Sequence, residues 1–433
     1  MGMKSFQKYA EHLDGLLDEV QWGQRTPDHS TKIQASLSDQ AAQVLHETAD
    51  KTSIWESGAY FTSPQLANLA IEPVTRQNGV LSRPVFDPTC GAGDLLLRWA
   101  DDLPVSRNLE TTLGKWEGLL RGRDVFPEFV RVAKRRLVLK AIARGARLQK
   151  ARAPKIDKLF PNLHEGDARK SQPVDTRLTL VMNPPFSTVK ATETCKWGSG
   201  KVSLAAVLFE SCLKQAPVRT RIVAILPDVL RTGTRYQRWR TAISEQLKVE
   251  RIQPYGRFDR HADIDVFIME GTVGPGVPIE WWHPQSGSSA DTVGDLFDVT
   301  VGAVVPHRDP HAGPWFPFAS SKSVAAWAHV KSIAEHRRFA GTTVQPPFTA
   351  VRRTSSPRDT QRAIGSIVTG DRRIAVENHL LIAKPKEGGV ESCEALLKSL
   401  RDQRTKVWLD ERIRCRHLTV GVLSELPVWE NSL

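Results

Sequence analysis

Four short apolar segments of this chain each end in a polar side chain. Three of these residues are Asp87, Asp124 and Asp167, and the fourth is Asn183. Helical patterns follow the first two segments, so the order strand, turn and helix is repeated. This order predicts an α/β doubly wound, Rossmann-like sheet, in which ligands bind at the carboxyl ends of the strands. We therefore expect the four side chains to lie together at one ligand site.

The fourth segment runs into the turn Asn183-Pro184-Pro185-Phe186. Prolines fix φ and lack an N–H donor, so the chain must leave the strand in a stiff, extended turn. This turn would present the Asn183 amide, the Pro184 carbonyl and the ring of Phe186. Two hydrogen-bond acceptors beside a ring suit a planar amine. The alternative interpretation of the turn alone is an ordinary strand exit with a packed phenylalanine.

A glycine-rich turn, Cys90-Gly91-Ala92-Gly93, follows the strand that ends at Asp87. Glycines let the backbone bend sharply and approach a ligand closely. The turn lacks the G-x-G-x-x-G spacing, so a dinucleotide pyrophosphate is not indicated. A carboxylate followed by Gly-x-Gly suits a zwitterion, with Asp87 facing its ammonium group. An acidic residue at the end of the second strand, here Asp124, can hold ribose hydroxyls.

Changes of pattern along the chain predict three parts: an N-terminal helical segment (1–54), a domain that carries the motifs (55–285) and a C-terminal mixed α+β domain (291–433). The N-terminal segment has an apolar stripe at helical spacing, expected to pack on the next domain. A second helix is expected over about 38–49, after a polar turn. Residues 187–203 lack periodicity and are interpreted as a mobile loop beside the site.

The helix that begins at Pro127 carries five basic residues, which we expect on its solvated face: Arg131, Lys134, Arg135, Arg136 and Lys140. The whole chain has 60 basic and 48 acidic residues, a net charge of +12. A basic balance favours a polyanionic partner such as nucleic acid.

The composition also bounds the class of protein. Five cysteines without a C-x-x-C pair argue against disulfides or structural zinc and fit a cytoplasmic protein. No apolar run is long enough for a membrane span, and residues 1–20 have no signal-peptide core. His307 and His311 are four residues apart, but Pro306 and Pro310 argue against a helix, so no metal site is expected.

Taken in order, the motifs resemble those of the N6-adenine DNA methyltransferases of the amino class, and most nearly the catalytic subunits of type I restriction–modification systems. The resemblance covers about residues 57–273. It is carried by Tyr60-Phe61-Thr62-Ser63-Pro64, by Asp87-Pro88-Thr89-Cys90-Gly91-Ala92-Gly93, by Asp124 and Asp167, and by Asn183-Pro184-Pro185-Phe186. Two departures are Ser63, where a proline is more usual, and Asp94, where a bulky residue is more usual.

The resemblance implies the cofactor S-adenosylmethionine and the partner double-stranded DNA, with a specificity or nuclease subunit as a further candidate partner. Thr62, Asp87, Gly91 and Gly93 would hold the methionine part of the cofactor, Asp124 its ribose and Asp167 its adenine. The full set of cofactor residues implied is Tyr60, Phe61, Thr62, Asp87, Pro88, Gly91, Gly93, Asp124, Val125, Asp167 and Ala168. Asn183, Pro184, Pro185 and Phe186 would be catalytic, and residues from 293 onward look similar to target-recognition domains.

Three functions stay open at this point. An adenine amine methylated in DNA, after the base leaves the duplex, fits the resemblance most closely. The same Asn-Pro-Pro-aromatic turn occurs in enzymes that methylate RNA bases, at adenine N6 or guanine N2, or glutamine side chains. A DNA-binding subunit of a larger restriction–modification complex, without catalysis, is the non-enzyme alternative.

Overall fold

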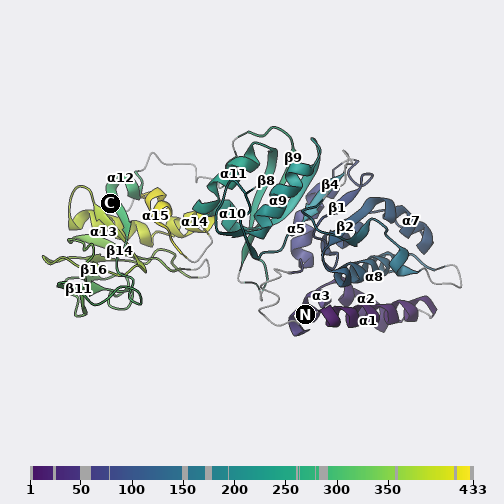
Figure 1. The fold of residues 1–433 in the computed structure, drawn as a ribbon, viewed down its shortest axis with the longest axis horizontal. Helices are drawn as coiled ribbons and strands as arrows, with labels where there is room; N and C mark the ends of the chain where they lie inside the picture. The colour runs from purple at the N-terminus through teal and green to yellow at the C-terminus, as the bar shows by residue number, and fades with distance from the viewer. Residues whose placement is uncertain are drawn as a thin grey trace. The chain divides into compact units, whose positions relative to one another are not determined.

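The computed structural model describes residues 3–22, 26–48, 60–77, 79–148, 155–170, 178–193, 195–259, 262, 264–277, 279–281, 291–355, 359–413 and 417–429. The chain divides into two compact units, Met1–Ile279 and Glu280–Leu433 (Figure 1). Most of the predicted boundary, residues 282–290, lies outside the described residues. The N-terminal helices belong to the first unit.

A seven-stranded sheet forms the centre of the first unit, in the order β3-β2-β1-β4-β7-β9-β8. The strands are β1 (Val85–Asp87), β2 (Leu120–Asp124), β3 (Leu163–Glu165), β4 (Thr179–Met182), β7 (Arg221–Pro227), β8 (Leu247–Arg257) and β9 (Asp265–Val273). The first five are parallel, whereas β9 is antiparallel to both of its neighbours. β2 and β3 lie on one side of β1, and β4 and β7 lie on the other. The crevice between the carboxyl ends of β1 and β4 is therefore the topological switch point, which is where sheets of this kind bind ligands. The predicted doubly wound sheet is confirmed, although β8 was not expected from the sequence.

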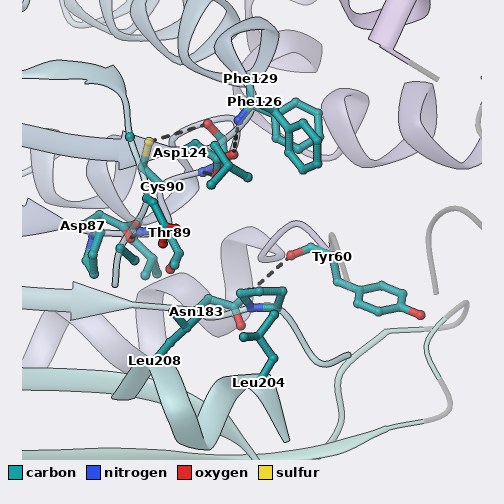
Figure 2. Close-up of a pocket in the computed structure, with 18 of the residues that line it drawn as sticks. Tyr60, Asp87, Thr89, Cys90, Asp124, Phe126, Phe129, Asn183, Leu204 and Leu208 are labelled. Atoms are coloured by element: carbon teal, nitrogen blue, oxygen red, sulfur yellow. Dashed lines mark hydrogen bonds between the residues drawn. The ribbon is translucent and has the colours of Figure 1, made fainter. Parts of the chain in front are cut away.

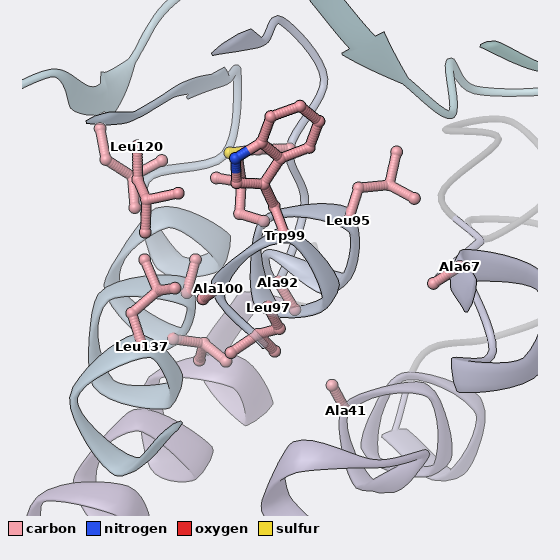
Figure 3. Packing of buried hydrophobic residues seen from close by; sticks show 14 of the residues in the cluster. Ala41, Ala67, Ala92, Leu95, Leu97, Trp99, Ala100, Leu120 and Leu137 are labelled. Atoms are coloured by element: carbon pink, nitrogen blue, oxygen red, sulfur yellow. The ribbon is translucent and has the colours of Figure 1, made fainter. Parts of the chain in front are cut away.

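Helices cover this sheet on both faces. Those that follow the N-terminal region are α5 (Pro64–Thr75), α6 (Asp94–Ala100), α7 (Leu109–Leu119), α8 (Pro127–Ala143), α9 (Leu204–Gln215), α10 (Asp228–Thr232) and α11 (Gln237–Ser244), with single 3₁₀ turns η1 (Ile156–Lys158) and η2 (Thr234–Tyr236). Figure 3 shows side chains of α6 and α8 meeting in one apolar cluster, to which Val181 of β4 also belongs. Leu180 and Met182 alternate with Val181 and point to the other face, and they are buried too. Burial on both faces explains why β4 is a continuous apolar run.

The three N-terminal helices are α1 (Met3–Trp22), α2 (Pro27–Leu37) and α3 (Gln40–Thr48). Helix α1 lies along α8 (Figure 1), and the ring of Phe6 is 4.7 Å from that of Phe129 between centroids. The predicted packing of the apolar stripe on the next domain is therefore confirmed. The expected polar turn before the second helix is wrong, because much of it forms α2. That helix buries only Ile33 and Ser36 among its side chains, so it has little apolar periodicity to detect.

The loop expected over residues 187–203 is also different in the structure. Strands β5 (Thr188–Lys190) and β6 (Lys201–Ser203) pair as an antiparallel hairpin. The strands are three residues long, which is too short for an alternating pattern to stand out in the sequence. The hairpin continues directly from the Asn183–Phe186 turn into α9.

The second unit is a mixed α+β domain, as predicted. A five-stranded sheet has the order β10-β17-β14-β15-β12, and a three-stranded sheet has the order β13-β11-β16. The strands are β10 (Phe297–Val301), β11 (Trp315–Ala319), β12 (His329–Val330), β13 (His336–Arg338), β14 (Phe348–Arg352), β15 (Gly365–Val368), β16 (Ala375–Val376) and β17 (Leu380–Pro385). The helices are α12 (Val293–Leu296), α13 (Val390–Arg401), α14 (Gln403–Arg412) and α15 (Val420–Glu425).

The described residues contain neither a metal-binding cluster nor a helix suited to a membrane. In that part of the chain, no group of three or more histidine, cysteine, aspartate or glutamate side chains is arranged to hold a metal ion. Across the same ranges, no helix combines the length and the apolar character needed to cross a bilayer.

Candidate active site

A pocket of about 260 Å³ lies at the carboxyl ends of β1, β2 and β4 (Figure 2). It brings together most of the residues that the sequence indicated as a site. The predicted residues that line it are Tyr60, Phe61, Thr62, Asp87, Pro88, Gly91, Asp124, Val125, Asp167, Ala168, Asn183 and Pro185. Three predicted residues, Gly93, Pro184 and Phe186, are not among the lining side chains. Each of these three lies in or directly beside the turns that do line it.

The glycine loop is held by hydrogen bonds of its own backbone. The N–H of Cys90 donates to the Arg123 carbonyl (2.8 Å), and the N–H of Gly93 donates to the Cys90 carbonyl (2.8 Å). Gly91 and Gly93 have φ of 51° and 89°, in the left-handed region that favours glycine. A Cβ added at Gly91 would lie 2.9 Å from Cε1 of Phe61. The loop therefore leaves a concave backbone surface that a side chain would fill.

Asp124 is tied to this loop by one carboxylate oxygen and to the start of α8 by the other. Oδ2 accepts from the N–H of Gly91 (2.9 Å), and Oδ1 accepts from the N–H of Phe126 (3.0 Å). Burial raises the pKa of Asp124 to about 6, against the lowering effect of these two bonds. Each oxygen still has a lone pair for a hydroxyl group of a ligand.

The other two predicted aspartates differ in their surroundings. Asp87 is buried, and burial raises its pKa well above the usual value, while Oδ1 accepts from the N–H of Thr89 (3.0 Å). Asp167 instead pairs with Arg169 (2.7 Å), and this hydrogen bond lowers its pKa. The predicted acceptor at Asp167 is thus already bonded within the chain, whereas Asp87 faces the pocket with few compensating partners.

Asp94, the departure noted in the sequence, is one end of a buried ion pair. Its Oδ1 accepts from Nη1 of Arg136 (2.8 Å), and its Oδ2 accepts from the N–H of Thr62 (3.1 Å). Burial raises the pKa of Asp94, and the Arg136 charge opposes that rise. The same guanidinium donates to the carbonyls of Ala92 (2.7 Å), Ser36 (2.7 Å) and Ser38 (3.2 Å).

The expectation that the basic residues of α8 form a solvated face is therefore wrong for two of them. Arg136 is completely buried, and Arg135 is 3% exposed and pairs with Asp14 (2.8 Å). Both guanidinium groups have acceptors at fixed positions on other elements, which offsets the cost of burying their charge. Arg136 joins α2 to the glycine loop and to the segment that carries Thr62.

Asn183 has one half of its amide bonded and the other half free. Nδ2 donates to Oγ1 of Thr62 (2.9 Å) and to the carbonyl of Tyr60 (3.3 Å), the bond visible in Figure 2. Because a backbone carbonyl can only accept, this contact fixes the NH₂ group on that side. Oδ1 is buried and has no hydrogen-bond partner among the described residues. A buried acceptor without a partner is costly, and a donor brought by a ligand would recover that cost.

Phe186 packs in an aromatic cluster beside Asn183. Its ring is nearly parallel to that of Tyr60, with 5.9 Å between centroids and an interplanar angle of 23°. Phe258 meets Phe186 edge-on at 5.1 Å. The residue after β8 thus completes the cluster, although nothing in its local sequence indicated a role.

Several other pocket residues were not predicted. They are Thr89, Cys90, Asp94, Leu95, Phe126, Phe129, Gly166, Arg169, Val189, Leu204 and Leu208. Some adjoin predicted residues in the sequence and could have been included on that ground. Leu204 and Leu208 are one helical turn apart, a spacing that the sequence does show, but only the tertiary structure brings α9 to the pocket. The hydroxyl of Thr89 is a second buried atom of the lining without a partner among the described residues.

Comparison with solved structures shows which fold this is. The type IIL restriction-modification enzyme MmeI, solved in complex with DNA, superposes with a TM-score of 0.54 at 13% identity, over 88% of this chain and 69% of that one. The DrdV–DNA complex gives 0.51 at 8% identity, over 94% of this chain and 59% of that one. At these identities the similarity establishes the fold alone.

No protein-family model matches the sequence, and the comparison with curated proteins gives no match. The fold and the sheet order are sufficient for one conclusion. The first unit has a Rossmann-like, doubly wound fold that it shares with MmeI, and a separate C-terminal domain follows it.

Proposed function

We propose that this protein transfers a methyl group from S-adenosylmethionine to the N6 amine of adenine in DNA. The observation that carries this proposal is the Oδ1 atom of Asn183, a buried acceptor without a partner among the described residues. It belongs to the lining of a pocket built from a glycine loop and four aspartates. An acceptor of this kind suits an N–H donor and offers nothing to a ligand that only accepts.

The pocket fits the cofactor through its charge and its shape. S-adenosylmethionine supplies a methyl group on a positively charged sulfonium. Asp87 would face the ammonium group, and the exposed backbone of Gly91 would accommodate the methionine part. Asp124 would accept the ribose hydroxyls, with Phe126 and Phe129 as the apolar lining nearby. Asp167 would reach the adenine amine only by sharing its carboxylate with Arg169.

Asn183 and Pro184 would act on the amine to be methylated. The lone pair of an adenine amine is conjugated with its ring, so the amine is a weak nucleophile. Two acceptors, Oδ1 of Asn183 and the Pro184 carbonyl, would hold the two N–H bonds and direct the lone pair out of the ring plane. Bound S-adenosylmethionine would supply the methyl group: the amine nitrogen would bond to the methyl carbon as the carbon–sulfur bond breaks with its electron pair left on sulfur, and one amine proton would pass to solvent.

The rest of the site would position the base rather than react with it. Phe186 would stack on the adenine, which must leave the duplex to reach the pocket. Fixed dipoles and alignment of the reacting atoms would supply most of the rate, without a covalent intermediate on the protein.

DNA is the proposed substrate because several observations agree with it. The chain is basic, with a net charge of +12. The similar structures of MmeI and DrdV are DNA complexes, and the similarity extends over most of this chain. We assign the second unit to recognition of the DNA sequence, and a specificity or nuclease subunit is a candidate further partner.

The test is methyl transfer from labelled S-adenosylmethionine to unmethylated genomic DNA, with identification of the modified base. N6-methyladenine in DNA is the expected product. Label on RNA but not on DNA would replace the proposal with RNA methylation. Cofactor binding without transfer to either would contradict the proposal for this chain acting alone, and a repeat with added candidate subunits would then identify the active assembly.

A further inference from the structure

A second groove of the first unit lies beside the hairpin that follows Phe186. It has a volume of about 620 Å³ and is lined by residues of two segments that are distant in sequence. One is the loop 196–199, and the other comprises η2 and the first turns of α11. The lining residues are Lys196, Trp197, Gly198, Ser199, Thr234, Arg235, Gln237, Arg238 and Thr241.

The lining carries positive charge without acidic side chains. Three of these nine described residues are cationic, and none is aspartate or glutamate. Lys196 and Arg238 are exposed, and no ion pair to either occurs among the described residues. Arg235 donates to the carbonyl of Ser199 and so keeps its charge at the groove. The hydroxyl and amide groups of Ser199, Thr234 and Gln237 add neutral donors.

The acidic side chain that bonds to Trp197 of the groove is already neutralised. Glu210 of α9 accepts from Nε1 of Trp197 (2.6 Å) and pairs with Lys214 (2.6 Å). Its carboxylate therefore stabilises the floor of the groove and does not cancel the cations above it.

The floor of the groove is held by packing and hydrogen bonds. Trp197 and Tyr236 are buried, and their rings lie 5.9 Å apart between centroids. The N–H of Ser203 donates to the hydroxyl of Tyr236 (3.0 Å), which ties strand β6 to η2. A groove with a fixed floor and exposed cations at its rim is preorganised to bind an anion.

The hairpin connects this groove to the pocket. Val189 of β5 and Leu204, directly after β6, line the pocket, whereas the loop between the strands lines the groove. Strands of three residues extend about 10 Å, since each residue rises roughly 3.3 Å. The strands of the hairpin alone therefore cover a length of about three nucleotides, at roughly 3.4 Å of helix axis per phosphate of one strand.

We infer that this groove binds phosphates of the DNA strand within a few nucleotides of the base that enters the pocket. Cations and neutral donors without an acid suit a phosphodiester backbone, and such contacts position a duplex without reading its sequence. The catalytic unit would thus hold the DNA strand itself, independently of the second unit. The inference rests on the proposed function, since it takes the substrate of that site to be DNA.

The test uses the full chain and the variant Lys196→Gln/Arg235→Gln/Arg238→Gln. Binding of a fluorescein-labelled DNA duplex is measured by anisotropy over a series of salt concentrations. Removal of one cation–phosphate interaction reduces the slope of log K against log salt by about 0.9, so we expect the three substitutions to reduce it by up to about 2.7. The KM for DNA should rise at least about fivefold, while kcat at saturating DNA and the Kd for S-adenosylmethionine stay unchanged.

The matched control is Arg83→Gln/Lys115→Gln/Lys248→Gln, which removes the same charge at exposed positions outside both the groove and the pocket. Its salt slope and KM for DNA should stay near those of the wild type. Equal effects in the two variants would overturn the inference, because net charge alone would then explain them. The double variant Lys196→Gln/Arg238→Gln keeps the Arg235–Ser199 bond, and a slope reduction of about 1.8 is expected there.

Failure of the inference can be told apart from failure of the proposed function. A wild-type protein that methylates DNA, together with a groove variant of unchanged slope, would contradict the groove alone. A wild-type protein that methylates no DNA would contradict the proposed function. A groove variant that loses affinity for RNA but not for DNA would also contradict the inference.

Discussion

The two turns that face the pocket differ in how far their polar groups are satisfied. The glycine loop bonds its N–H groups to neighbouring carbonyls and to Asp124, and Arg136 binds the carbonyl of Ala92. The turn that begins at Asn183 has its amide nitrogen fixed by two acceptors but leaves Oδ1 without a partner among the described residues.

This difference agrees with the two roles proposed for the turns: the glycine loop holds the cofactor, and Asn183 accepts a hydrogen bond from the substrate. A loop whose backbone is held by hydrogen bonds keeps its shape without ligand, so it can hold a cofactor at low entropic cost. An unpaired acceptor costs free energy in the empty pocket and recovers it only when a donor arrives. Thr62 connects the two, because its N–H donates to Asp94 and its hydroxyl accepts from Asn183.

The largest expected effect is a loss of stability in Arg136→Met, which removes the guanidinium that supports the glycine loop. This change leaves the Asp94 carboxylate and three backbone carbonyls without their buried partner. Breaking one side of a buried pair costs about 3–5 kcal/mol, and urea unfolding should report a loss of that size. Adding Asp94→Asn removes the stranded charge and should recover part of the loss. An unfolding free energy unchanged in Arg136→Met would show that the network does not support the loop.

Asn183→Ala removes the amide of the Asn183–Phe186 turn and leaves the hydrogen bonds of the glycine loop in place. We expect methyl transfer to fall by at least about 100-fold in kcat, as for loss of a preorganised polar contact to the reacting group. The Kd for S-adenosylmethionine, measured by calorimetry, should change little. Thr62→Val serves as a milder comparison, since it removes the hydroxyl that orients the Asn183 amide. If Asn183→Ala remains active, the assignment of the turn is wrong.

Gly93→Ala tests the shape of the loop by itself. Gly93 has a φ of 89°, and a Cβ there would lie 3.0 Å from Cβ of Ala133 on α8. A left-handed conformation costs a side chain about 1–2 kcal/mol, so thermal unfolding should show a loss of stability of at least that size. Gly114 is the control, because it lies within α7 with no atom within 4 Å of an added Cβ. Gly114→Ala should stabilise the protein by about 0.5–1 kcal/mol; a similar gain in Gly93→Ala would contradict the strained loop.

The pH dependence of cofactor binding gives the smallest expected effect. Burial raises the pKa of Asp124 to about 6, and only its ionised form can accept two ribose hydroxyls without donating. Affinity for S-adenosylmethionine should therefore be constant above pH 6 and fall up to about tenfold for each pH unit below it. Calorimetry across this range, with Asp124→Asn for comparison, measures the effect, and a flat profile in the wild type would exclude this role for Asp124.

The raised pKa of Asp124 also affects the stability of the protein without ligand, and this effect has the opposite pH dependence to cofactor binding. The folded state holds the Asp124 proton more tightly than the unfolded state does, so this group makes the free energy of unfolding fall as pH rises from about 4 to about 6. The stability contribution of Asp124 is thus greatest where the cofactor is expected to bind most weakly.

Local sequence was sufficient for the elements that have strong short-range signals. Polar residues at strand ends, prolines and Gly-x-Gly predicted the positions of Asp87, Asp124 and Asn183, and the structure brings these three to one pocket. The roles assigned to them stay predictions. The hairpin of β5 and β6 and helix α2 were not predicted, because three-residue strands and a mostly polar helix leave little periodicity.

Burial of charge was decided by the tertiary structure. Arg136 and Lys140 are one helical turn apart and look alike in the sequence, yet only Arg136 is completely buried. The difference comes from α2 and the glycine loop, which bring their carbonyls to Arg136 from distant parts of the chain. Sequence therefore determined the sheet and the polar residues at its edge, since these depend on local backbone preference. Which cations are buried, and which acceptor stays open at the pocket, depends on contacts that only the folded chain makes.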